Sequence, residues 1–292
     1  IHNMKRTLFI LLSAFAVGLG NALACTNLIV GKKASKDGSV MITYSCDDYG
    51  AYGFMNWQPG GKHKKGEMRA LYHYESNNYL GEIPEAKETY SVIGLMNEFQ
   101  LTIHETTFGG REELEDTTGL FDYGSLMYVT LQRARNAREA IKVMAGLVEE
   151  YGYCSNGESF SIADPNEVWI LEMIGKGPGR KGAVWVAVRI PDDCISAHAN
   201  QSRIRQFPLK DKENCLYSKD VISFAREKGY FSGKDEEFSF QAAYAPTDFG
   251  AQRFCEARVW SFFNRWAAED MKPYLGYAMG ETGADPMPLY VK

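Results

Sequence analysis

Residues 25–32 read Cys-Thr-Asn-Leu-Ile-Val-Gly-Lys, and residues 39–44 read Ser-Val-Met-Ile-Thr-Tyr. Both stretches are rich in the residue types that favour extended strands. The turn signal Lys36-Asp37-Gly38 lies between them. We therefore predict an N-terminal β-hairpin whose first strand, over residues 26–32, directly follows Cys25.

The segment before this hairpin has the features of a secretion signal. A basic pair at residues 5–6 is followed by an apolar run over residues 8–19 and by Ala22-Leu23-Ala24, whose outer residues are small. The run is too short for a membrane-spanning helix, so we expect no stable span. Residues 1–24 are thus interpreted as a few upstream residues plus an export signal, and the mature protein is expected in the periplasm or outside the cell.

Cleavage after Ala24 would make Cys25 the first residue of the mature chain. That residue would then carry a thiol nucleophile and a free α-amine that can act as its general base. The ordinary pKa values of the two groups, about 8.5 and about 7.7–8.0, are matched near neutral pH. A dyad of another cysteine with His104 or His198 stays open as an alternative, although no local signature marks one.

Two simpler interpretations of Cys25 are also open. It could be the acylated cysteine of a bacterial lipoprotein, in which case the chain would be a surface-anchored binding protein. Such proteins usually have leucine three residues before the cysteine, and this chain has Ala22. Alternatively, Cys25 could be an ordinary core residue, because free cysteine is among the most buried residue types.

Composition limits the class of protein. The whole sequence is 45% hydrophobic, which is ample for a folded core in a mature chain of residues 25–292. Removing Lys5 and Arg6 leaves 30 basic residues against 37 acidic ones, a net charge of −7, so we expect no nucleic-acid partner. The six cysteines show no CxxC spacing, so we expect neither a metal site nor a dense disulfide framework.

The order of predicted elements indicates an α+β fold in one catalytic domain over residues 25–292. Helical spacing marks residues 122–135 and 136–151, with Asn136 as a capping residue for the second helix. The other predicted elements are a hairpin of strands at 90–95 and 100–104, further strands at 159–163, 168–173 and 183–188, helices at 218–228 and about 249–268, and loops with short strands over 45–87. The chain stops at Lys292 without a closing signal, which is typical of a fragment.

Several motifs in the same order resemble the dipeptidase A family, cysteine peptidases among the N-terminal-nucleophile (Ntn) hydrolases that are related to choloylglycine hydrolases and penicillin V acylases. The likeness covers nearly the whole mature chain. The segments that carry it are residues 25–42, Gly94-Leu-Met-Asn-Glu98, His104-Glu-Thr-Thr107, Ile195-Ser-Ala-His-Ala-Asn-Gln201 and residues 244–260. The resemblance implies a four-layer αββα sandwich and a dipeptide substrate, with no metal or other cofactor.

The resemblance also implies roles for individual residues. Cys25 would be the nucleophile, and Asp47 would bind its α-amine. A carboxylate is suitable for this role because its negative charge stabilises the ammonium form of the amine. Asn200 would donate to the oxyanion, since a neutral amide stabilises developing charge without titrating. Arg253 is favoured over Arg258 as the late arginine near the nucleophile.

Three further positions are candidate substrate-binding residues: Tyr44, Thr107 and Arg258. Tyr44 stands where the family usually has an arginine. Thr107 ends a strand at which related enzymes place a backbone oxyanion donor. If Arg253 and Arg258 share one α-helix, they lie about 140° apart around its axis, so only one of them can point at the nucleophile.

The leading hypothesis is therefore an exported dipeptidase that acts on small peptides through Cys25. A related amidase for bile-salt conjugates or acylated amines is the alternative within the same superfamily, and the lipoprotein acylated at Cys25 is the alternative from another class. Side-chain preference and oligomeric state have no signature in the sequence.

Overall fold

The computed structural model describes residues 24–47 and 55–292. Within them the strands form a four-stranded sheet A, an eight-stranded sheet B and two short two-stranded ribbons, and their neighbouring strands are antiparallel. The predicted α+β class is confirmed. Apart from Ala24, the expected export signal lies outside the described residues.

In spatial order, sheet A consists of β16 (Tyr290–Val291), β14 (Ile195–His198), β1 (Ala24–Val30) and β2 (Met41–Asp47). Sheet B consists of β15 (Cys215–Tyr217), β13 (Ala183–Ile190), β12 (Val168–Gly175), β11 (Gly157–Ala163), β10 (Thr102–Gly109), β9 (Met96–Asn97), β8 (Val92–Ile93) and β3 (Trp57–Gln58). The ribbons pair β4 (Gly61–Lys62) with β7 (Glu88–Thr89) and β5 (Met68–Tyr72) with β6 (Tyr79–Pro84).

The α-helices are α2 (Tyr123–Leu131), α3 (Ala137–Tyr151), α4 (Val221–Glu227), α5 (Phe240–Tyr244), α6 (Ala257–Trp266), α7 (Ala268–Met271) and α8 (Leu275–Ala278). Single turns of 3-10 helix occur at η1 (Glu112–Leu114), η2 (Asp235–Glu237) and η4 (Lys272–Tyr274), and η3 (Ala251–Glu256) is a π-helix. Among the described residues, no helix is both long and apolar enough to cross a membrane.

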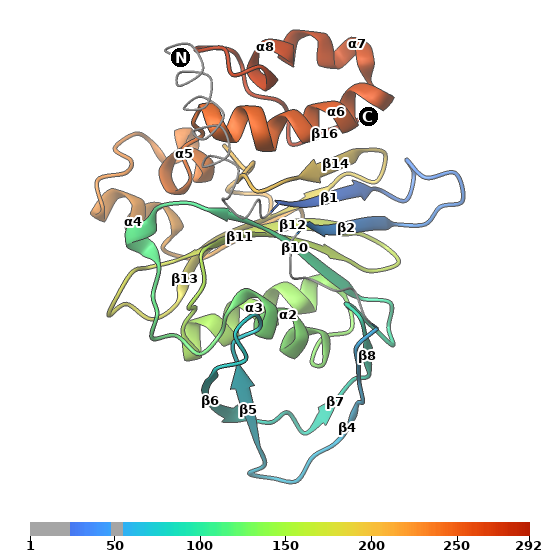
Figure 1. The fold of residues 1–292 in the computed structure, drawn as a ribbon, viewed down its shortest axis with the longest axis vertical. Coiled ribbons are helices and arrows are strands. Elements are labelled where there is room, and N and C mark those ends of the chain that lie inside the picture. The colour runs from blue at the N-terminus through green and yellow to red at the C-terminus, as the bar shows by residue number, and fades with distance from the viewer. Residues whose placement is uncertain (1–23, 48–54) are drawn as a thin grey trace, which may run out of the picture.

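The central strands of sheet B, β11 and β12, are buried on both faces. In β12, Trp169 and Leu171 face the core that includes α2 and α3, whereas Ile170 and Ile174 face the core shared with Ile29 of β1. This two-sided burial explains why these strands read as almost continuous apolar runs. Figure 1 shows α2 and α3 on one side of the sheets and α6, α7 and α8 on the other.

Sheet A is covered on its outer face by α6. Leu28 and Val30 of β1 pack against the cluster that contains Val259 and Phe263 of this helix. The residues that alternate with these along β1, including Cys25 and Ile29, point the other way and are buried against sheet B. The alternation of β1 therefore aims the Cys25 side chain between the two sheets.

Local signals account for the elements that were predicted correctly. The N-terminal hairpin forms as β1 and β2, with Val30 opposite Met41 at its closed end. Helix α3 begins after Asn136, whose side chain accepts the backbone N–H of Glu139. Strands β11, β12 and β13 follow at the predicted positions.

Two predicted elements differ from the structure. Residues 90–95 and 100–104 do not pair directly as a hairpin, because β9 lies between β8 and β10 and pairs with both. The helix predicted over 249–268 starts as the π-helix η3 and becomes α-helical only at Ala257. A π-helical segment changes the direction in which its side chains point, and such segments are frequent at functional sites.

Candidate functional site

Cys25 lies near the start of β1 with its side chain 9% exposed. In the chain as described, its nitrogen is a peptide amide joined to Ala24. That nitrogen donates a hydrogen bond of 2.7 Å to Oδ1 of Asn200. Because Asn200 follows β14, the neighbour of β1 in sheet A, the sheet brings together two residues 175 positions apart.

The side-chain amide of Asn200 is held in one orientation. Its Oδ1 accepts from Cys25, and its Nδ2 donates to the backbone oxygen of Thr107 at 2.8 Å. The backbone of Asn200 has a φ of 59°, in the left-handed region that asparagine tolerates better than most residues. One N–H of Nδ2 is used by Thr107, and an amide carries two.

Arg258 of α6 uses all five of its N–H donors. Nε donates to the oxygen of Phe254, and Nη1 donates to the oxygen of Cys25 at 2.6 Å and to Oγ1 of Thr26 at 2.8 Å. Nη2 donates to the oxygen of Ala199 and to Oδ1 of Asn200, both at 2.9 Å. Arg258 thus joins both sides of the contact between Cys25 and Asn200.

Arg253, which the sequence interpretation favoured over Arg258 as the arginine near the nucleophile, lies elsewhere. Its Nη1 contacts the oxygen of Ala278 and the sulfur of Met279 at the start of the C-terminal segment. The preference rested on the local Gln252-Arg253-Phe254 sequence, which does not determine where either guanidinium points in a helix that starts as the π-helix η3. Of the two arginines, the geometry brings Arg258 to Cys25.

Asp47 is not brought to the Cys25 nitrogen. It lies opposite Ala24 at the exposed end of β2 and accepts a hydrogen bond of 2.7 Å from Oγ of Ser45. The Cys25 N–H points away from β2, toward Asn200. Asp47 is therefore a close neighbour of the Ala24–Cys25 peptide bond without a hydrogen bond to its nitrogen.

Tyr44 and Thr107 each contact a buried carboxyl group. The hydroxyl of Tyr44 donates to Oε1 of Glu105, and its ring stacks on His104 with centroids 5.3 Å apart. Oγ1 of Thr107 donates to Oε1 of Glu158 at 2.6 Å. Burial raises the pKa of the Tyr44 hydroxyl, and the charge of Glu105 adds to this effect.

Glu105 and Glu158 themselves are diagonal neighbours on β10 and β11, and both are almost fully buried. Burial raises the pKa of both carboxyls, most strongly that of Glu158, which also feels the charge of Glu105. Oε1 of each carboxyl accepts a hydrogen bond from a hydroxyl group, whereas Oε2 of each is buried without a hydrogen-bond partner among the described residues. Because two ionised carboxylates this close together and this deeply buried would repel each other, the surroundings favour protonation of one of the pair.

The charge of Glu105 acts on the thiol of Cys25. Burial is the main cause that raises the pKa of the Cys25 thiol, and the charge of Glu105 is the next. Cys46, which lies directly opposite on β2, and Glu158 act in the same direction. In the uncut chain the surroundings of Cys25 thus favour the neutral thiol over the thiolate.

A second carboxylate fixes the turn that carries Asn200. Glu172 of β12 accepts the backbone N–H groups of Arg203 and Ile204 at 2.5 and 3.1 Å, and Oγ of Ser202 at 2.5 Å. Burial raises the pKa of Glu172 to about 7. The turn that follows β14 is thereby tied to sheet B.

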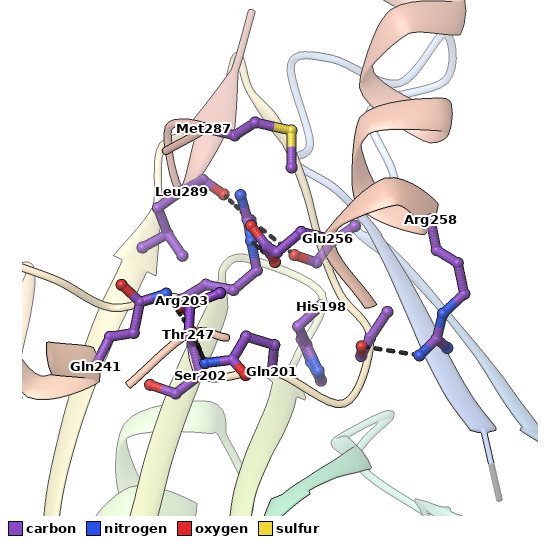
Figure 2. A network of polar contacts seen from close by, with 12 residues as sticks. His198, Gln201, Ser202, Arg203, Gln241, Thr247, Glu256, Arg258, Met287 and Leu289 are labelled. Carbon is purple, nitrogen blue, oxygen red and sulfur yellow. Dashed lines mark hydrogen bonds and ion pairs between the residues drawn. The ribbon is translucent and has the colours of Figure 1, made fainter. Parts of the chain in front are cut away.

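Arg203 connects this turn to β14, to Glu256 of η3 and to the segment before β16. Its guanidinium pairs with Glu256 at 3.0 Å, with both side chains buried, and donates to the oxygens of Ala197 and Leu289. Figure 2 shows Arg203 between Glu256 and Leu289, while Arg258 approaches from α6. The backbone next to Asn200 is therefore fixed by the contacts of both Glu172 and Arg203.

Comparison with known proteins identifies the family of this chain. A model of peptidase family C69 matches residues 24–64 and 59–292. A protein from Salmonella dublin named probable dipeptidase is 31% identical over 274 residues, which cover 85% of this chain and 60% of that protein. The chain belongs to peptidase family C69. The resemblance to the dipeptidase A family is confirmed.

Other relatives of this C69 family chain have similar names. A probable dipeptidase from Latilactobacillus sakei is 27% identical, with 81% of this chain and 52% of that protein covered. A probable dipeptidase A from Streptococcus pyogenes serotype M3 is 26% identical, with 86% and 57% covered. The chain thus spans between about half and 60% of the length of these relatives.

Both histidines that were considered as alternative bases are held neutral in this C69 family chain. His198 is fully buried, its ring nitrogens contact Oγ1 of Thr106 and Oγ of Ser161 at 2.7 Å each, and burial lowers its pKa to about 3. Burial lowers the pKa of His104 to about 4. His198 belongs to a polar layer between the sheets, and His104 stacks on Tyr44.

The sequence interpretation missed Glu105, Glu158 and Cys46. A signal existed for the two glutamates, since each stands within a strand of apolar and small residues, where an unpaired carboxylate is costly. Their proximity to each other depends on the register of β10 and β11, which no local pattern encodes. Cys46 had no signal beyond its residue type.

Proposed function

We propose that this chain is the catalytic part of an exported cysteine dipeptidase that becomes active when the bond between Ala24 and Cys25 is cut. The observation that carries the proposal is the 2.7 Å hydrogen bond between the Cys25 nitrogen and Asn200. It keeps the nitrogen that would become the α-amine beside the thiol and the amide side chain. The C69 family match, which begins at residue 24, supports the position of the cut.

The arrangement of elements supports assignment to the four-layer αββα sandwich of Ntn hydrolases. Helices α2 and α3 share a core with sheet B, and α6 shares one with sheet A. In this proposal the nucleophile occupies the first strand, where the alternation of β1 turns it toward the second sheet.

The proposed reaction starts with transfer of the Cys25 thiol proton to its own α-amine. The thiolate attacks the carbonyl carbon of the substrate peptide bond, and the protonated amine gives its proton to the leaving nitrogen as that C–N bond breaks. Water, deprotonated by the same amine, then hydrolyses the thioester and releases the acid. The second N–H of Asn200 Nδ2 is the proposed oxyanion donor in both steps.

Arg258 acts in this proposal as a positioning residue. Its guanidinium holds the carbonyl of Cys25 and Oδ1 of Asn200 in one rigid fork. This keeps the nucleophile and the oxyanion donor in fixed relative positions, as efficient acyl transfer requires.

A cavity beside Asn200 is the proposed substrate pocket. Its volume is about 430 Å³, and its lining includes Asn200, Phe108, Pro246 and Phe254. Small-molecule sites commonly measure about 300–1,000 Å³, so a dipeptide is a suitable occupant. The names of the bacterial relatives, all probable dipeptidases, support the same substrate class.

The test is hydrolysis by a chain that begins at Cys25, measured on a panel of dipeptides beside one bile-salt conjugate. We expect dipeptides to be cleaved and the conjugate to remain intact. Cys25→Ser should abolish turnover, because a hydroxyl of much higher pKa is a poor nucleophile beside an ordinary amine. Cys154→Ser, at a partly buried thiol outside this site, is the matched control and should keep activity.

Mass spectrometry of the amino terminus after expression in an exporting bacterium tests the maturation. A free cysteine at position 25 agrees with the proposal. A diacylglyceryl adduct on Cys25 would instead identify an anchored lipoprotein, and a chain that retains its first 24 residues while hydrolysing dipeptides would remove the amine from the mechanism.

A further inference from the structure

Cys46 stands directly opposite Cys25 in the β1–β2 hairpin. Residues that face each other across an antiparallel pair project their side chains to the same side of the sheet. The two thiols therefore share the face of sheet A that looks toward sheet B. The neighbouring thiol of Cys46 is among the causes that raise the pKa of Cys25.

The backbone fixes which kind of pair they form. Both polar backbone atoms of Cys25 point away from β2, since its N–H bonds Asn200 and its oxygen accepts from Arg258. Cys25 and Cys46 are therefore a non-hydrogen-bonded pair, in which Cα atoms lie about 4.5 Å apart. Disulfides span Cα separations of about 4.4–6.8 Å, so the two sulfurs can join without a change of strand register.

The two thiols differ in access to solvent. Cys46 is exposed near the open end of the hairpin, whereas Cys25 is buried. A small oxidant or a reducing dithiol meets Cys46 first. Both thiols are free in the structure, so the reduced state is the one described.

We propose that Cys25 and Cys46 are a reversible redox pair, whose disulfide switches off the nucleophile. The disulfide is a modification of this hairpin in its own right. Its effect on turnover rests on the proposed function of Cys25.

The chemistry needs a two-electron oxidant, and hydrogen peroxide is the one we name. The thiolate of Cys46 attacks one peroxide oxygen, the O–O bond breaks, and Cys46 becomes a sulfenic acid as one water leaves. The thiolate of Cys25 attacks the sulfur of Cys46, the S–S bond forms, and the hydroxyl leaves as a second water. Two thiols are oxidised by two electrons in total, and one peroxide is reduced to two waters.

Reduction proceeds by thiol–disulfide exchange at the exposed sulfur of Cys46. A thiolate of dithiothreitol attacks Cys46 to give a mixed disulfide and frees Cys25 as its thiolate, which takes a proton. The second thiol of dithiothreitol then attacks the dithiothreitol sulfur that is bonded to Cys46. This releases the Cys46 thiol and leaves dithiothreitol as its cyclic disulfide.

The experiment treats the mature chain that starts at Cys25 with hydrogen peroxide and then blocks remaining thiols. Peptide mapping without reduction should find the peptides of Cys25 and Cys46 joined, with the loss of two hydrogen atoms. Dipeptide hydrolysis should be lost in parallel and return fully with dithiothreitol. Cys46→Ser should lose activity irreversibly, because a sulfenic acid on Cys25 then has no partner and oxidises further, while Cys154→Ser should behave as the wild type.

Peptide mapping and the hydrolysis assay distinguish failure of the redox pair from failure of its switching role. If peroxide oxidises the folded protein without joining Cys25 to Cys46, or if Cys46→Ser recovers as completely as the wild type, the redox pair is refuted. If the disulfide forms and hydrolysis continues, the pair exists but its switching role is refuted, and Cys25 is not the nucleophile of the proposed function.

Discussion

The side-chain oxygen of Asn200 lies 2.7 Å from the backbone nitrogen of Cys25. Arg258 donates to the same oxygen at 2.9 Å. The nitrogen that a cut after Ala24 would free thus already has a fixed acceptor in the uncut chain. The catalytic geometry we propose therefore needs little rearrangement after the cut, which is consistent with preorganisation of a site on rigid elements.

Asn200→Ala and Asn200→Asp separate two roles of this residue. The alanine variant loses the acceptor for Cys25 and the donor to Thr107, whereas aspartate keeps an acceptor and loses the donor. Removal of one oxyanion donor lowers kcat by about 10²–10³, so we expect both variants to fall by that order. Steady-state kinetics on the preferred dipeptide provide the measurement, and near-normal kcat for Asn200→Asp would exclude Asn200 as the oxyanion donor.

Arg258→Lys should impair turnover because lysine cannot reproduce five donors in a planar fork. Losing a hydrogen bond from a charged group costs about 1.5–3 kcal/mol, so we expect kcat to drop by about tenfold or more. Arg253→Lys is the matched control from the same helical segment and should change kcat little. The reverse ranking of the two variants would return the positioning role to Arg253.

The structure of the hairpin and of α3 could be predicted because their signals are local. A turn sequence lies between β1 and β2, and Asn136 caps α3. The two-residue strand β9 has too few residues to show a period, so it was missed. Local sequence determines these elements only where they are long enough to show a pattern.

The site was predictable to a smaller degree. Family motifs pointed to Cys25 and Asn200, which the structure brings together. The choice between Arg253 and Arg258 depends on the course of the helix that carries them, and its π-helical start η3 has no sequence signature. The pairing of Glu105 with Glu158 depends on strand register. Contacts between segments distant in the sequence therefore determine which side chains surround Cys25, and no single motif encodes these contacts.

Glu172→Gln should remove a pH dependence of stability. Burial raises the pKa of Glu172 from 4.5 to about 7, so between these values the folded protein holds a proton that the unfolded chain releases. Below pH 4.5, Glu172 contributes about 3 kcal/mol to the free energy of unfolding, and this contribution is lost as pH rises through about 7.

Urea unfolding of both proteins at pH 5 and pH 8 measures this effect. Relative to Glu172→Gln, the wild type should lose stability at the higher pH. An equal change in both proteins would mean that Glu172 titrates near its ordinary pKa and that the hydrogen bonds it accepts offset the burial.

Asp47→Asn tests whether the carboxylate opposite Ala24 serves the new amine. After the cut, an ammonium at Cys25 would lie near this carboxylate, which would stabilise its charge. We expect a lower kcat with an unchanged unfolding temperature, while Ser45→Ala, which removes the hydroxyl that bonds Asp47, should keep most activity. An unchanged rate for Asp47→Asn would leave Asn200 as the residue that holds the amine.

The uncut chain provides the most direct test of the mechanism. In it, the nitrogen of Cys25 is an amide whose lone pair is delocalised into the carbonyl of Ala24, so it cannot accept the thiol proton. Burial and the charge of Glu105 also raise the pKa of that thiol, so the thiolate is scarce without a base. Purified chain with residues 1–24 attached should therefore hydrolyse dipeptides far more slowly than chain that starts at Cys25.

The pH profile of the cut form identifies the base. An amine must be deprotonated to accept a proton, so kcat/KM should rise with pH through the pKa of an α-amine, about 7.7–8.0. Both forms need their amino termini verified by mass spectrometry before and after the assay. His198 has a pKa near 3 and His104 near 4, so a histidine base would give a profile already flat at neutral pH. That profile, together with equal activity of the two forms, would show that Cys25 does not depend on a free amine.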